Sequence, residues 1–247
     1  MEIKTLQSFI DFYKDEPENQ KQISDYFIEM TNSIPELKKY RDWIEQNVYG
    51  FGEREFHFLW YLILLCFKEK NNGENIKLIE LGVFRGQILG AWGLIAKLID
   101  CKVKRYGITP LTPIEIGWES DYKKDIQTLH NTFDIPCDYH LFEDVSQNEI
   151  TIKLAKQVSP FDVLYIDASH EYNNVKSDLE NYLPMIKSGG ILVIDDSCNS
   201  LNSCYSGRFW GIADVTRAVD ELLPPFTENK DFTFIGNVIH NRIYIKN

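Results

Sequence analysis

Three aspartates follow two short apolar segments in the second half of the chain. Asp167 ends the segment FDVLYID, and Asp195 and Asp196 end the similar segment ILVIDD. Neither segment alternates with polar residues, a pattern typical of strands buried on both faces of a parallel sheet. Three carboxylates in one cleft repel one another, and at least one takes up a proton unless a cation lies between them.

Oxygen ligands of this kind suit a hard divalent ion, so we expect Asp167, Asp195 and Asp196 to hold Mg2+, or Mn2+ in its place. The alternative is that Asp195 and Asp196 only cap the loop that follows them, because aspartate is common where loops begin.

The segment between the two acidic strand ends predicts the connection that brings them together. Apolar residues recur at helical spacing from Val175 to Ile186, and Gly189 and Gly190 end the helix. A strand, helix, strand unit of this kind is a right-handed crossover between parallel strands. Both strands then end at the edge where open α/β sheets bind ligands, with Asp167 beside Asp195.

Composition and charge limit the classes of protein to consider. The 247 residues, 44% of them hydrophobic, can bury the core of one α/β domain with an appendage. The net charge of -11 argues against nucleic acid or an anionic membrane as the partner and favours a small molecule. The five cysteines include no CxxC pair, which indicates a reducing compartment. The first residues lack the apolar core of a signal peptide, and residues 56–67 are too few to cross a membrane, so we expect a cytoplasmic protein.

Residues 1–75 are predicted to be helical throughout. Pro35 opens one helical segment, and residues 53–70 form another that is apolar on most sides. These helices could be a cap or lid over the active site, or a scaffolding element. Their apolar faces also make a homodimer an open possibility.

A glycine turn follows the first predicted strand, IKLIELG. Glu80 ends this strand, Gly82 allows a tight turn, and Gly86 allows close approach at the start of the next helix. The spacing is not G-x-G-x-x-G, so the loop is not shaped for a dinucleotide pyrophosphate. A short loop after an acidic strand end suits a smaller cofactor with a cationic end.

The chain resembles the class I S-adenosylmethionine-dependent methyltransferases in five segments. These are ELGVFRG, YGI, FDVLYIDASHEY, LPMIKSGGILVIDD and GIADVTRAVDELL. Within that class the chain looks like the metal-dependent macrocin-type sugar O-methyltransferases and their cephalosporin-hydroxylase-like relatives. The resemblance covers residues 76–247 and implies a Rossmann-like, seven-stranded, mostly parallel sheet with an antiparallel last strand. Residues 1–75 would be the N-terminal helical cap. The implied ligands are S-adenosyl-L-methionine, Mg2+ or Mn2+, and an acceptor that is a sugar or a nucleotide-activated sugar.

The resemblance also implies which residues contact the cofactor. They are Glu80, Gly82, Arg85 and Gly86 at the methionine end, Thr109 near the ribose, Asp144 and Ser146 at the adenine, and Asp167. Thr109 departs from the family pattern, because an acid there accepts two hydrogen bonds from the ribose. Either cofactor affinity is weaker or Glu115 or another loop residue substitutes. Glu80 could instead pair with Arg85, and Ser146 could cap a helix.

Several other side chains have two possible roles. His170 follows Asp167 by three residues and could be a general base or only a neighbour of the metal. Arg208 could bind a substrate phosphate or pair with a surface acid, and Trp118 could line an acceptor pocket. The remaining histidines are predicted to be surface or boundary residues (His130, His140) or to lie away from the chemistry (His57, His240).

The sequence therefore predicts metal-assisted methyl transfer to a sugar hydroxyl, with Asp167 or His170 taking the proton. One alternative is a metal-independent N- or O-methyltransferase that uses His170 as the base. The other is a binding protein without catalysis.

Overall fold

The computed structural model describes residues 2–13, 17–73, 75–112, 119–202, 204–227 and 229–247. Glu115 and Trp118, which the sequence proposed for the ribose and the acceptor, lie outside these ranges.

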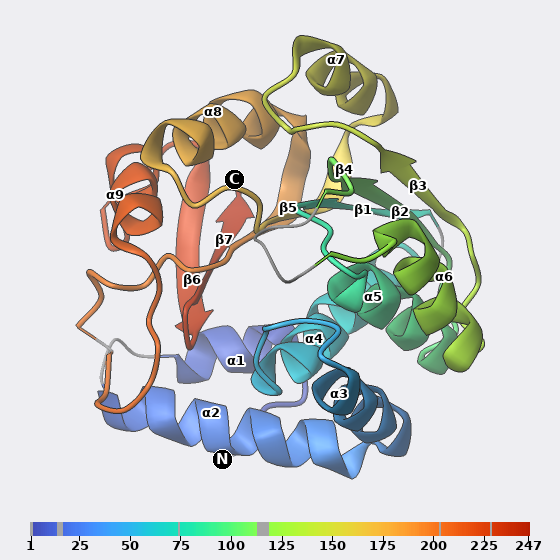
Figure 1. Ribbon diagram of the computed structural model, residues 1–247. Coiled ribbons are helices and arrows are strands. Elements are labelled where there is room, and N and C mark those ends of the chain that lie inside the picture. The colour runs from blue at the N-terminus through green and yellow to red at the C-terminus, as the bar shows by residue number, and fades with distance from the viewer. Residues whose placement is uncertain (1, 14–16, 74, 113–118, 203, 228) are drawn as a thin grey trace.

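A seven-stranded sheet forms the centre of the fold, in the order β3-β2-β1-β4-β5-β7-β6 (Figure 1). The first five strands run parallel, β7 pairs antiparallel with β5, and β6 pairs antiparallel with β7. This arrangement confirms the predicted Rossmann-like sheet with an antiparallel last strand. The strands are β1 Ile76–Leu81, β2 Val103–Ile108, β3 Tyr139–Phe142, β4 Phe161–Ile166, β5 Ile186–Ile194, β6 Phe232–Val238 and β7 Asn241–Lys246.

Helices cover both faces of the sheet. One face packs against α1 Leu6–Phe12, α2 Pro17–Ser33, α3 Pro35–Asn47, α4 Glu55–Lys70, α5 Gln87–Leu98 and α6 Tyr122–Thr132, and the other against α7 Glu149–Val158, α8 Tyr172–Tyr182 and α9 Ala213–Leu222. A short 3-10 helix, Leu183–Met185, leads into β5. Among the described helices, none combines the length and the apolar character that crossing a bilayer requires.

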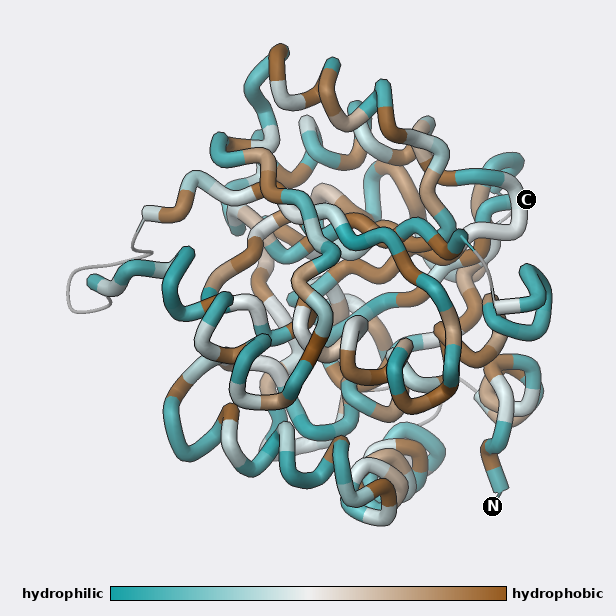
Figure 2. The backbone as a smooth tube through the Cα atoms, turned by 90° about the vertical axis from the view of Figure 1, so that its right-hand side faces the viewer, coloured by the Kyte–Doolittle hydropathy of each residue, from teal (hydrophilic) through white to brown (hydrophobic). Residues whose placement is uncertain are grey.

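The β4 strand shows why the sheet lies between two layers of helices. All six of its residues are buried. Val163 and Tyr165 enter the core under α1–α6, while Leu164 and Ile166 enter the core under α7–α9. Burial on both faces explains the lack of polar alternation in its sequence. Figure 2 shows the same distribution, with hydrophobic backbone segments inside and hydrophilic ones on the outer turns.

The N-terminal helices share a core with the sheet rather than standing apart from it. The Trp60 ring on α4 lies 5.3 Å from the Trp92 ring on α5 and 5.2 Å from the Tyr165 ring on β4, each in an edge arrangement. Phe27 on α2 packs at 5.1 Å against Phe58 on α4. Residues before and after position 75 therefore bury one continuous apolar surface.

We expect a fragment of residues 76–247 to lose cooperative thermal unfolding, because removing residues 1–75 uncovers the large part of one sheet face that α1 to α4 cover. Circular dichroism at increasing temperature would check this against the full chain. A sharp transition in the fragment would instead show that residues 1–75 are a separable domain.

Candidate active site

The carboxyl ends of β1, β4 and β5 lie side by side and position the three aspartates. Ile166 pairs with Ile194 in the sheet, so the residues that follow them are neighbours. The backbone N–H of Asp195 donates to the carbonyl of Ile166 at 3.0 Å, and that of Asp167 donates to Leu81 at 2.9 Å. The structure thus brings Asp167 beside Asp195 and Asp196, through the crossover that the sequence indicates.

Gly82 makes this close approach of β1 and β4 possible. Its φ is +95°, and a Cβ there would lie 1.8 Å from the carbonyl oxygen of Asp167. Any other residue would push the loop after β1 away from the loop after β4.

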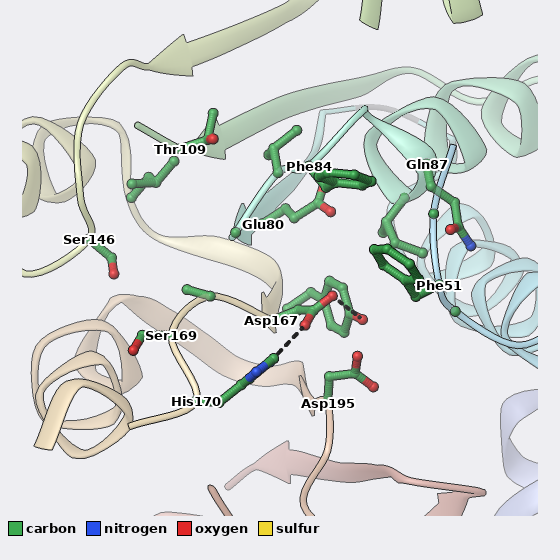
Figure 3. Close-up of a pocket in the computed structure, with 18 of the residues that line it drawn as sticks. Phe51, Glu80, Phe84, Gln87, Thr109, Ser146, Asp167, Ser169, His170 and Asp195 are labelled. Atoms are coloured by element: carbon green, nitrogen blue, oxygen red, sulfur yellow. Dashed lines mark hydrogen bonds and ion pairs between the residues drawn. The ribbon is translucent and has the colours of Figure 1, made fainter. Parts of the chain in front are cut away.

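A cavity of about 700 Å3 opens at these strand ends (Figure 3). Figure 3 shows Asp167, His170 and Asp195 grouped on one side of it, with Thr109 and Ser146 farther along and Phe51 at the opposite end. Predicted site residues that line the cavity are Glu80, Gly82, Thr109, Asp144, Ser146, Asp167, His170, Asp195 and Asp196. The described lining does not include Arg85 or Gly86.

Arg85 points to the N-terminal segment. Its Nε lies 3.0 Å from Asp125 Oδ2, and its guanidinium lies 5.3 Å from the centre of the Tyr49 ring. Its Nη1 donates to the carbonyl of Val48 at 3.1 Å. These contacts tie α6 to residues 48–49 and occupy the side chain, so the alternative pairing of Glu80 with Arg85 is not formed.

The carboxylates at the strand ends share a buried environment that strongly perturbs them. Burial, together with the charge of Asp195, raises the pKa of Asp167 to about 8. Burial and Asp195 likewise raise the pKa of Asp196 to about 6. Burial also acts to raise the pKa of Asp195, but the adjacent His240 outweighs it and lowers that pKa. A cleft that holds this much unbalanced acid favours a cation.

His240 belongs to this cluster, and the prediction that it lies away from the chemistry is wrong. Its Nε2 lies 3.2 Å from Asp195 Oδ1 and 3.9 Å from Asp196 Oδ1. Among the described residues, Asp195, Asp196 and His240 form a set whose ligand atoms all lie within 4.8 Å of one another, as metal binding requires. Burial disfavours the imidazolium, but the carboxylate of Asp195 overcomes this and raises the pKa of His240.

The hairpin of β6 and β7 explains why sequence reasoning missed His240. The residue occupies the turn between these strands, far from Asp195 in sequence, and Ser197 N–H donates to its carbonyl at 2.9 Å. The predicted antiparallel last strand is the signal that could have found it: a strand that runs antiparallel to β5 begins beside the end of β5, which brings the turn before it to the acidic edge.

His170 also faces the acids. Its Nε2 lies 3.4 Å from Asp196 Oδ2 and 3.8 Å from Asp167 Oδ1. The nearby carboxylate of Asp167 raises the pKa of His170 despite the partial burial of the imidazole. Its side chain is 47% exposed, so it can meet both a substrate and solvent.

His130 is not the surface or boundary residue that the sequence predicts. It is fully buried, its Nδ1 lies 2.8 Å from the carbonyl of Ile126, and its Nε2 lies 3.1 Å from Arg105 Nη1. Burial, then the charge of Arg105, lowers its pKa to about 4. His140 is exposed as predicted, whereas His57 is buried in the N-terminal core, where burial lowers its pKa to about 3.

The end of the cavity near Glu80 fits a cationic cofactor. Glu80 is 3% exposed, and its Oε2 has no hydrogen-bond partner among the described residues. Burial, then Asp167, raises its pKa well above the usual range. A buried acceptor without a donor, at the cavity wall, suits the ammonium or sulfonium group of S-adenosylmethionine.

The opposite end of the cofactor region contains the neutral side chains of Thr109 and Ser146 and the carboxylate of Asp144. Thr109 Oγ1 accepts a hydrogen bond from Leu111 N–H at 3.1 Å, which occupies one of its acceptor positions and leaves its O–H able to donate. Ser146 Oγ accepts from Gln147 at 2.8 Å, and the Ser146 carbonyl accepts from Tyr182 at 2.7 Å. The helix cap that follows is supplied by Asn148 rather than Ser146.

Arg208 pairs with acidic side chains, as the second of its two predicted roles required, but its main partner is a buried acid and not a surface one. Its Nη2 donates to Glu55 Oε1 at 2.7 Å and lies 3.7 Å from Glu53 Oε2. Glu55 is buried on α4 and the Arg208 side chain is 27% exposed, so a part-buried ion pair holds the loop after β5 against the N-terminal helices.

Comparisons with known proteins agree with this fold. Residues 79–197 match the family model described as a methyltransferase domain. Among curated proteins, no sequence matches the chain. A solved Corynebacterium glutamicum protein is similar with a TM-score of 0.56 at 12% identity, over 90% of this chain and 96% of that one.

Two solved methyltransferases have the same fold. CalS11, a TDP-rhamnose 3'-O-methyltransferase of calicheamicin biosynthesis, gives a TM-score of 0.52 at 14% identity, over 96% of this chain and 97% of that one. The O-methyltransferase NovP gives 0.50 at 17% identity, over 76% and 78%. Residues 79–197 thus match a methyltransferase domain, and the two solved methyltransferases share the fold of the chain. The match identifies a methyltransferase enzyme rather than the non-catalytic alternative.

Asp178 lies beneath the turn that contains Ser146. The raised pKa of its buried carboxyl group can be tested by experiment. The side chain is fully buried, one oxygen accepts from Gln147 at 2.8 Å, and burial raises its pKa to about 7. The folded protein therefore keeps a proton that the unfolded chain releases near pH 4. Stability from the protonated form is fully present below about pH 4 and is lost as the pH rises to about 7.

We expect Asp178→Asn to raise the midpoint of thermal unfolding by several degrees at pH 8 and by much less at pH 5, because the amide carries no charge to bury. Differential scanning calorimetry at both pH values measures this. Asp11→Asn, an exposed carboxylate on α1, is the matched control. An equal change in the unfolding midpoint at the two pH values would contradict the raised pKa of Asp178.

Proposed function

We propose that the protein transfers the methyl group of S-adenosylmethionine to a hydroxyl of a sugar or sugar-nucleotide, assisted by Mg2+ or Mn2+. The observation that carries this proposal is the meeting of three carboxylates and two imidazoles at one wall of a cavity with an unpartnered Glu80. The choice of a sugar hydroxyl is supported by the resemblance of the chain to sugar O-methyltransferases, and CalS11 is described as acting on TDP-rhamnose.

The metal ligands that we propose begin with Asp195 and Asp196. Their oxygens belong both to the predicted trio and to the set within 4.8 Å that includes His240. Asp167, beside Asp195, remains our third ligand, and His240 either joins the set or orients Asp195. The donor set of carboxylate oxygens with imidazole suits Mn2+ as well as Mg2+. When bound, such an ion would lower the pKa of an acceptor hydroxyl.

The remaining steps belong to residues of the chain. Glu80, Gly82, Thr109, Asp144 and Ser146 would hold the cofactor along the cavity. Asp167 or His170 would accept the proton of the acceptor hydroxyl. S-adenosylmethionine, when bound, would supply the methyl group: the acceptor oxygen would gain a bond to the methyl carbon as the bond from carbon to sulfur breaks, with S-adenosylhomocysteine as the leaving group.

Residues 1–75 would act as the cap of this site. The segment from Tyr49 to Glu53, which joins α3 to α4, lines the cavity. The 79–197 match together with this lining supports a division into a cap and a methyltransferase domain at about residue 75, although both parts share one core.

The contacts of His170 favour a second candidate. An imidazole that touches Asp167 and Asp196 without an ion could itself deprotonate an amine or hydroxyl. Metal dependence separates this candidate from the first.

We expect Asp195→Ala to weaken Mn2+ binding at least tenfold while the affinity for S-adenosylhomocysteine stays within about twofold, because Asp195 is one of the proposed metal ligands, whereas Glu80 is proposed to hold the cofactor. Isothermal titration calorimetry measures both. Asp214→Ala on the exposed start of α9 is the matched control. Methyl transfer that persists in excess chelator, with no Mn2+ binding to the wild-type chain, would refute the metal role and leave the His170 candidate.

A further inference from the structure

The charge of the cavity bears on which acceptor can enter it. The described residues that line it include six carboxylates and two histidines, and none of them is a lysine or arginine. The carboxylates are those of Glu53, Glu80, Asp144, Asp167, Asp195 and Asp196. A phosphate would enter against this charge without a basic partner from the described lining.

Arg208 cannot readily serve as that partner. Its guanidinium donates to buried Glu55 at 2.7 Å and lies 3.7 Å from Glu53. Turning it toward a phosphate would leave Glu55, whose side chain is 1% exposed, with a hydrogen bond from Ser24 but without its charged partner.

An aromatic face stands at the end of the cavity near the metal acids. Phe209 is 51% exposed, lines the cavity and meets the His240 ring edge-on at 5.3 Å. Phe56 holds the same imidazole at 4.9 Å, so Phe209 has a fixed neighbour behind it. A large exposed apolar side chain in a cavity wall is a ready contact for a ring-shaped ligand.

Glu53 lies beside this aromatic face. Its contact with Arg208 places it next to the turn that carries Phe209, and its side chain is 38% exposed. A bound ion and the sulfonium would offset charge at the strand ends. At the rim, Arg208 lies closer to Glu55, at 2.7 Å, than to Glu53, at 3.7 Å, so the Glu53 carboxylate next to the aromatic ring is only partly balanced. Both of these groups attract an ammonium ion.

We infer that the acceptor is a hydroxylated ring that carries an amine, stacked on Phe209 with its ammonium toward Glu53, rather than a phosphorylated or nucleotide-linked sugar. This inference rests on the proposed function and narrows its substrate class. Neutral rings bind the same subsite more weakly, and phosphorylated rings bind it least.

The test uses the full chain saturated with S-adenosylhomocysteine. Three pyranosides that differ at one position, carrying an ammonium, a hydroxyl or a phosphate, are titrated by ligand-observed NMR. We expect affinity to fall in that order. Phe209→Ala should weaken the ammonium and hydroxyl compounds about fivefold to tenfold. Glu53→Gln should remove the preference for the ammonium compound, a change of about fivefold.

Two matched variants control for unrelated effects. Phe226→Ala removes another exposed phenylalanine that does not line the cavity, and Glu36→Gln neutralises an exposed acid on α3. Neither should change any of the three affinities.

The outcomes separate the inference from the function on which it rests. If the wild-type chain does not bind S-adenosylhomocysteine, the proposed methyl transfer fails. If it binds the cofactor product but binds the phosphate compound as tightly as the ammonium one, or is insensitive to Phe209→Ala, the acceptor inference alone is overturned. Failure of all three pyranosides to bind also overturns it.

Discussion

Repulsion among buried carboxylates is the constraint on which the rest of the site depends. Parallel pairing of β4 with β5 fixes Asp167 next to Asp195 and Asp196, and Gly82 lets β1 approach them closely enough to add Glu80. Burial then raises the pKa of Asp167 and of Glu80. Such a cluster is costly unless cations balance it. A divalent ion and a sulfonium cofactor together would provide that balance.

Elements outside the parallel sheet complete the site. The hairpin of β6 and β7 carries His240 to the acids, and the loop after β5 carries Phe209 to the same wall. The part-buried ion pair of Arg208 and Glu55 holds that loop against α4. Because the N-terminal helices share a core with the sheet, this pair joins two parts of one rigid body. Under the proposed function, the acceptor would bind between the segment from Tyr49 to Glu53 and the acidic edge of the sheet.

Local sequence patterns predicted the parts of the fold that local physics determines. FDVLYID and ILVIDD read as doubly buried strands because every residue of β4 and the last five residues of β5 are buried. The prediction that Gly189 and Gly190 end the helix is wrong: α8 ends at Tyr182, and both glycines lie within β5. Parallel topology then placed Asp167 and Asp195 at one edge. His240 was missed because its position depends on the register of β7 against β5, which no local pattern specifies. The burial of His130 depends likewise on Arg105, an arginine that is 1% exposed and donates to the carbonyls of Leu89 and Pro136.

The most direct test of the account is a crystal structure of the full chain with S-adenosylhomocysteine and Mn2+, with anomalous scattering recorded at the manganese edge. We expect one anomalous peak about 2 Å from oxygens of both Asp195 and Asp196, and cofactor density that runs from Glu80 toward Ser146. An absence of anomalous signal at the two aspartates, in crystals whose cavity holds the cofactor, would contradict the claim that these strand ends are built around a metal ion.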